Sequence, residues 1–199
     1  MQDRDPEKFS RQLSHVFSEC FRVLKDQGLM VFSFHHSKPE AWLSIYQAVT
    51  TAQFRIVASH PVKAEMSVSK TKSATTNPIN LDAILVCKKQ AHQQPLNSSE
   101  AEVWSEAREH YQKYCCRLAK VGRVLSNNDR YVILSSQILV YASFTGLNKA
   151  KTQQLLDRAY KLDFSHDKDI EKQKNHELSP NFWKKQLVTE QTSFAFIDE

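Results

Sequence analysis

Glycine is scarce in this sequence, which has 199 residues and three glycines, Gly28, Gly122 and Gly146. No Gly-x-Gly segment occurs, whereas nucleotide-binding folds use closely spaced glycines that let the backbone approach the ligand. The chain therefore has no recognisable glycine loop for a nucleotide or a phosphate group.

Cysteine pairs and long apolar runs are also lacking. The four cysteines form no Cys-x-x-Cys pair, and no set of Cys and His residues has the spacing of a zinc site. No apolar run approaches the ~20 residues that a membrane-spanning helix needs. The polar residues 1–5 do not resemble a signal peptide. The sequence therefore predicts a cytoplasmic protein with reduced cysteines, no metal site and no membrane contact.

The excess of positive charge is small. The formal net charge is +5, from 27 basic and 22 acidic residues. Such a charge permits a polyanionic partner without requiring one. An ordinary charged surface explains it equally well.

The first 60 residues alternate between helical and strand patterns. Asp5 and Pro6 begin a helix that Gly28 ends, and residues 29–34 are almost continuously apolar. Such a run is typical of a strand buried on both faces in a parallel sheet. Ser37 and Glu40 have the spacing of a capping box for a second helix. A further strand over residues 54–59 completes a βαβ unit.

A third strand, residues 81–87, follows a long polar loop over residues 67–80. Loops of this length inside a domain are usually functional or mobile. Residues 91–99 are predicted to be a linker. Helical patterns follow, with Asn148 capping one helix and Ser179 beginning a last short one. We therefore divide the chain into residues 1–90, the linker at 91–99, and a mainly helical region at 100–199.

Several segments of the first part form a distinctive series. A helix ends with Arg-Val-Leu-Lys at residues 22–25, and the next strand ends with Phe-His-His at residues 34–36. Later segments continue it in order: Ala41-Trp42, Phe-Arg-Ile-Val at 54–57, Pro-Val-Lys-Ala-Glu-Met at 61–66 and Asp-Ala-Ile-Leu-Val-Cys-Lys-Lys at 82–89. Residues 21–89 thus resemble the adenine-specific DNA methylases often described as containing a zinc ribbon. The Arg-Val-Leu-Lys part is common to many methyltransferases, whereas the His-His pair and the Pro-Val-x-x-Glu-Met segment narrow the resemblance to the DNA group.

The resemblance implies an α/β fold with part of a Rossmann-like methyltransferase sheet. Residues 29–34 would be its fifth strand, residues 54–59 its sixth and residues 81–87 its antiparallel seventh. The active site of such a doubly wound sheet lies beyond the carboxyl ends of the strands. The family's glycine-rich methyl-donor loop and its Asp-Pro-Pro-Tyr or Asn-Pro-Pro-Tyr motif should lie upstream. Neither occurs here, and the zinc ribbon is also absent.

These absences limit the expected chemistry. The adenine amine is a poor nucleophile, and the Pro-Pro-Tyr segment binds its hydrogens and stacks on the flipped base. S-adenosyl-L-methionine (SAM) must also be held in line with that nitrogen. We therefore expect part of a SAM-dependent DNA adenine-N6 methyltransferase that is inactive alone, with no SAM site or catalytic residue in this chain. The chain is then either one subunit of a split enzyme or the product of a truncated gene. DNA and, for a split enzyme, a second polypeptide with the N-terminal half are the expected partners.

Other interpretations remain open from the sequence. The chain fits a non-enzymatic DNA-binding or interaction module, or a methyltransferase fragment that acts on RNA or a small molecule. A partial sheet also leaves an unpaired edge, and unpaired edges promote association. We therefore expect the isolated chain to aggregate or to bind its missing half.

The candidate residues facing DNA or the substrate end the first strand pattern or lie between the second and the third. They are His35, His36, Lys63, Glu65, Lys70 and Lys72. The histidines would line the target-base pocket, and the lysines of the polar loop would contact phosphates. Alternatively, the histidines have local structural roles and the loop is a solvated surface. Trp42, Tyr46 and Trp104 fall on helical stripes and are expected in the core.

Overall fold

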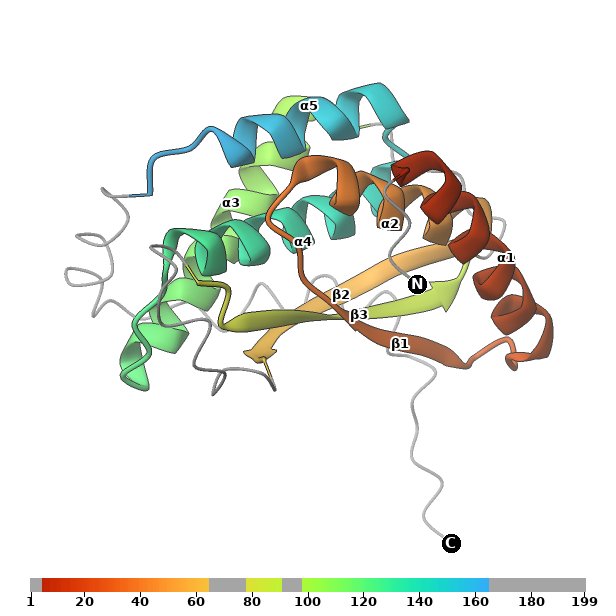
Figure 1. Ribbon diagram of the computed structural model, residues 1–199, viewed down its shortest axis with the longest axis horizontal. Helices are drawn as coiled ribbons and strands as arrows, with labels where there is room; N and C mark the ends of the chain where they lie inside the picture. The colour runs from red at the N-terminus through yellow and green to blue at the C-terminus, as the bar shows by residue number, and fades with distance from the viewer. Residues whose placement is uncertain (1–4, 65–77, 91–97, 165–199) are drawn as a thin grey trace, which may run out of the picture.

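Two helices and three strands make up the first half of the described chain, and three helices follow (Figure 1). The computed structural model describes residues 5–64, 78–90 and 98–164. Within these ranges the fold is α/β, with five helices and one three-stranded antiparallel sheet. The elements are α1 (Pro6–Val23), β1 (Leu29–Phe34), α2 (Pro39–Thr51), β2 (Phe54–Lys63), β3 (Leu81–Lys89), α3 (Glu100–Lys120), α4 (Asn127–Thr145) and α5 (Lys149–Tyr160).

The strand order in the sheet is β1-β3-β2, so the last strand in the chain lies in the middle. Strand β3 is antiparallel to both neighbours, and β1 and β2 are therefore parallel to each other. The register shifts between Ile56 and Ala58, which marks a β-bulge. The Ser143 hydroxyl on α4 accepts a hydrogen bond from the Ile56 backbone N–H, 2.8 Å away. A helix residue thus satisfies a backbone donor at the irregular point of β2.

Helices α1, α2 and α4 pack on one face of the sheet (Figure 1). The ring of Phe17 on α1 lies 5.1 Å from that of Phe32, and Trp42 on α2 lies 5.0 Å from Phe34. Helix α4 is buried along almost its whole length because α3 and α5 cover its outer side. Residues of the first 90 positions and of the helical part therefore share one hydrophobic core.

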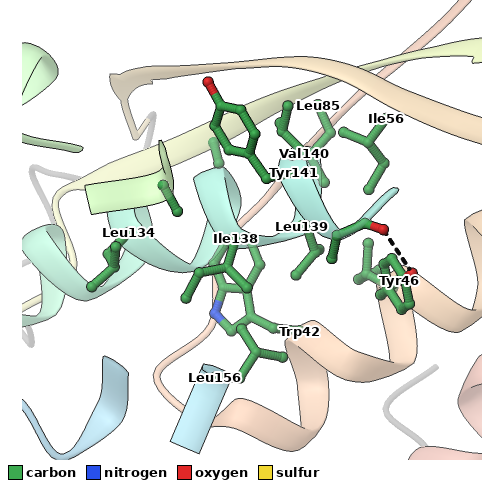
Figure 2. Packing of buried hydrophobic residues seen from close by; sticks show 14 of the residues in the cluster. Trp42, Tyr46, Ile56, Leu85, Leu134, Ile138, Leu139, Val140, Tyr141 and Leu156 are labelled. Atoms are coloured by element: carbon green, nitrogen blue, oxygen red, sulfur yellow. Dashed lines mark hydrogen bonds between the residues drawn. The ribbon is translucent and has the colours of Figure 1, made fainter. Parts of the chain in front are cut away.

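The centre of this core is built around α2 and α4. Figure 2 shows Trp42 and Tyr46 packed among Ile138, Leu139 and Leu156. The Tyr46 hydroxyl donates to the Leu147 carbonyl oxygen at 2.5 Å, and burial raises its pKa to about 12. The expectation that Trp42 and Tyr46 are core residues is confirmed. Trp104 is only partly buried, and the Arg158 guanidinium lies over its ring at 4.0 Å.

The two faces of the sheet differ in burial. On β3 the side chains facing the helices are buried, and they are Leu81, Ala83, Leu85 and Cys87. The other face is only partly covered by described residues, and Leu29 and Val31 on β1 are 44% and 53% exposed. The prediction that residues 29–34 are buried on both faces is therefore wrong. Among the described residues, β1 lies at the sheet edge and packs against helices on one face only.

The observed helix ends confirm some of the predicted caps and contradict others. The Asp5 carboxylate accepts from the backbone N–H of Glu7, so the predicted cap is confirmed. Helix α1 ends at Val23, well before Gly28. The predicted Ser37 cap of α2 is also wrong, because Lys38 is the N-cap and makes no side-chain capping bond. The Asn148 cap of α5 is confirmed, whereas the predicted helix after Ser179 lies outside the described residues.

Candidate functional site: the carboxyl edge of the sheet

The carboxyl ends of β1 and β2 lie at the same edge of the sheet because the two strands are parallel. Strand β3 begins at this edge, between them, with Ala83 opposite Phe34 and Leu81 opposite Lys63. His35 and His36 follow β1 directly. The structure therefore brings three of the six candidate residues to one edge, with β3 between the histidines and Lys63.

His35 is bonded to a residue that the sequence patterns did not single out. Its Nδ1 atom contacts the Oδ1 atom of Asp82, the second residue of β3. The His35 side chain is 42% exposed, and that of Asp82 is 18% exposed. A carboxylate accepts the Nδ1–H proton, so the lone pair of a neutral His35 lies on Nε2. The arrangement orients a hydrogen-bond acceptor or proton acceptor at the carboxyl edge.

His36 has a structural environment. Its Nδ1 accepts from the Lys38 backbone N–H at 3.0 Å, and its carbonyl oxygen accepts from Trp42 Nε1 at 2.9 Å. Burial lowers the His36 pKa below the usual 6.5, and the nearby charges of His35 and Lys38 lower it further. A neutral ring is also what the Lys38 contact requires, because Nδ1 must carry a lone pair. His36 thus fixes the entry to α2.

The backbone between β2 and β3 is anchored by Asp129, which is 1% exposed in the first turn of α4. Its Oδ1 accepts from the backbone N–H groups of Asn80 at 2.6 Å and Leu81 at 3.1 Å. Its Oδ2 accepts from the Asn80 side chain and from the Ser126 backbone N–H. The carboxylate therefore ties the start of α4 to the start of β3.

Lys63 is exposed at the last position of β2. The next residue, Ala64, donates its backbone N–H to the Asn80 carbonyl oxygen at 2.9 Å. Glu65, Lys70 and Lys72 lie outside the described residues. The position of Lys63 keeps it among the candidates for contacting a ligand at this edge.

The described residues hold no candidate metal site, and a cavity found among them lies away from the carboxyl edge. No group of three His, Cys, Asp or Glu side chains in residues 5–64, 78–90 and 98–164 is placed to hold a metal ion. An open cavity of about 400 Å³ lies where α4 ends and α5 begins, lined in part by Ser99, Gly146 and Lys151. It is therefore separate from the carboxyl edge. No helix in the described ranges is long and apolar enough to cross a membrane.

Comparison with models of protein families, with curated proteins and with solved structures found no match.

Proposed function

We propose that this chain is the C-terminal part of a SAM-dependent methyltransferase that acts on N6 of adenine in DNA. The observation that carries the proposal is the direction of β3. The sequence resemblance requires a last strand antiparallel to the two before it, and β3 runs antiparallel to both β1 and β2. A fold built only of βαβ units would have three parallel strands instead.

The free edge of β1 supports a complementary half. Within the described residues β1 pairs with β3 on one side and with no strand on the other. Its outward side chains on the open face include the exposed Leu29 and Val31. An apolar edge strand is a template for pairing with further strands. We propose that the fourth strand of the complementary half pairs with this edge of β1. The same half would carry the donor loop and the Pro-Pro-Tyr motif.

The His35–Asp82 pair supports a site at the carboxyl edge. Ligands of doubly wound sheets bind beyond the carboxyl ends of the strands, and His35 follows the last residue of β1. Its Nε2 atom is free of the Asp82 contact, which involves Nδ1. In the proposed enzyme, His35 lines the pocket of the flipped adenine as a hydrogen-bonding residue. SAM would supply the methyl group, bound by the complementary half.

The test is reconstitution with the product of the neighbouring upstream reading frame. That product is first checked for a Gly-x-Gly loop and an Asp-Pro-Pro-Tyr or Asn-Pro-Pro-Tyr motif. The two polypeptides are co-purified and incubated with SAM and unmethylated genomic DNA, and N6-methyladenine is measured by mass spectrometry. We expect methylation with both polypeptides and none with either alone.

Two results would overturn parts of the proposal. Methylation by the 199-residue chain alone would contradict the need for a complementary half. A purified complex with both motifs that methylates RNA or a small molecule but no DNA would contradict the DNA substrate. An Asp82→Asn variant distinguishes a role of the His35–Asp82 pair in the reaction from a role in complex formation. The variant should still form the complex but should methylate DNA more slowly.

A further inference from the structure

The turn between α3 and α4 exposes apolar and basic side chains together. Val121 and Val124 are 74% and 93% exposed, the two largest values among the exposed large apolar residues described. Lys120 and Arg123 flank them and are also exposed. Exposed apolar residues that lie together and are rimmed by polar residues mark many interaction surfaces.

The backbone of this turn is well defined by hydrogen bonds. Gly122 has a φ of +76°, which favours glycine, and its N–H donates to the Ala119 carbonyl oxygen at 2.9 Å. The Arg123 N–H donates to the Leu118 carbonyl oxygen at 2.9 Å. These two bonds form a Schellman motif at the end of α3. The turn therefore presents its side chains on a fixed backbone.

The turn lies beside the carboxyl edge of the sheet. Just after it, the Ser126 hydroxyl donates to the Pro78 carbonyl oxygen at 2.6 Å. Asp129 then binds the backbone at Asn80 and Leu81, where β3 begins. In Figure 1 the end of α3 and the start of α4 lie at the end of the sheet where β2 stops. The turn is thus connected, through Ser126 and Asp129, to the backbone where β3 begins.

The charges of the turn are not neutralised by nearby acids. Lys120 and Arg123 form no ion pair with any described carboxylate. Asp129 is buried and accepts four hydrogen bonds from neighbouring groups, and Asp82 contacts His35. An exposed pair of cations beside such an edge attracts an anionic polymer.

We propose that the α3–α4 turn, residues 120–124, is a DNA-contacting element. Lys120 and Arg123 bind backbone phosphates, and Val121 and Val124 enter the groove next to the base pair that is opened. The inference rests on the proposed function, because an enzyme that flips an adenine must offset the loss of stacking. Apolar side chains in the minor groove of other DNA-binding proteins act in this way.

The test is the binding of the full chain to a fluorescently labelled, mixed-sequence duplex, measured by anisotropy at several salt concentrations. Phosphate contacts do not depend on sequence, so the unknown recognition site is no obstacle. The double variant Lys120→Gln/Arg123→Gln should weaken binding about tenfold and reduce the slope of log K against log salt by about two. The control Arg11→Gln/Lys25→Gln removes the same charge at exposed positions outside the turn and should leave both quantities nearly unchanged.

The apolar contact is tested separately. Val124→Ser should weaken binding about fivefold through the loss of buried apolar surface, with the salt slope unchanged. Val16→Ser, at an exposed valine on α1, should have no effect. Equal losses in the two double variants, or unchanged binding in Lys120→Gln/Arg123→Gln, would overturn the proposal. Thermal melting of each variant shows whether it is folded.

Failure of this inference and failure of the proposed function give different results. Binding needs neither SAM nor the complementary half. If the reconstituted enzyme methylates DNA and Lys120→Gln/Arg123→Gln leaves its DNA affinity unchanged, the turn has no role and the function stands. If the variant loses DNA binding and no reconstituted complex methylates adenine, the turn binds DNA and the methyltransferase proposal fails.

Discussion

The two faces of the sheet carry similar apolar residues in very different surroundings. Leu85 faces the helices and is fully buried, whereas Val31 on the opposite face is 53% exposed. Val86 lies opposite Val31 in the ladder and is also only partly covered. Apolar residues on a half-covered face add little to the stability of the chain, because stabilisation follows the area removed from water. Among the described residues, the covered face therefore contributes more to the stability of the chain than the open face does.

The largest expected difference in stability between the two faces is that between substitutions at neighbouring residues of β3. Leu85→Ala should lower the free energy of unfolding by about 2–5 kcal/mol, because it leaves a cavity beneath α4. Val86→Ala, next to it on the open face, should cost less than about 1 kcal/mol. Urea denaturation of both variants measures the difference. Equal losses would contradict the contrast between the faces.

The next largest loss of stability is expected at Asp129, a buried carboxylate on the covered side of the sheet. Asp129→Ala removes the acceptor of three backbone N–H groups and lowers the free energy of unfolding by about 3 kcal/mol. Asp129→Asn keeps one oxygen acceptor and should lose less. Hydrogen exchange at Asn80 and Leu81 reports the local effect, since these amides become less protected if the anchor is lost. Unchanged exchange in Asp129→Ala would show that the anchor is not needed.

The stability of the chain should depend on pH because burial lowers the pKa values of two histidines. His110 on α3 is buried against the Tyr141 hydroxyl of α4, and burial lowers its pKa below 6.5. The unfolded chain then binds more protons than the folded chain as the pH falls through 6.5, so stability decreases on acidification. His110→Gln should reduce this pH dependence, measured as melting temperature between pH 7.5 and 5. In this variant His36, whose pKa is also lowered, should still contribute its share of the pH dependence. Greater stability of the native chain at the lower pH would contradict the sign.

The smallest effect on stability is expected on the open face of β1. Val31→Lys should change the free energy of unfolding by less than about 0.5 kcal/mol. If the edge of β1 pairs as proposed, Val31→Lys should also reduce self-association and the binding of the proposed complementary half, because a charge on an edge strand opposes pairing. Sedimentation velocity and co-purification measure both. Val16→Lys, at a similarly exposed valine on α1, is the control and should change neither.

Local signals predicted the helices and strands, although the Ser37 cap was wrong, and non-local contacts explain what was missed at the site and on β1. The Asp5 and Asn148 caps act on the next turn of chain, so their patterns were sufficient. The His35–Asp82 contact joins residues 47 positions apart, and no spacing rule reveals it. An acid in the apolar run at residues 81–87 was the available signal.

The environment of β1 was missed for a related reason. An apolar run predicts burial, but the run does not say whether the covering layer belongs to the same stretch of chain. In the described residues that layer covers one face only. The sequence patterns therefore predicted an unpaired sheet edge but did not predict the exposure of Leu29 and Val31 on one face of β1.

The order of the strands has a consequence for folding. Strand β3 is the last of the three to be synthesised and the middle one in the sheet. Within the described sheet, neither β1 nor β2 has a ladder to join until β3 is present. Pairing between distant segments raises the contact order and slows folding. On the ribosome the first two strands emerge with all their edges open, and this interval is where chaperones would be needed most.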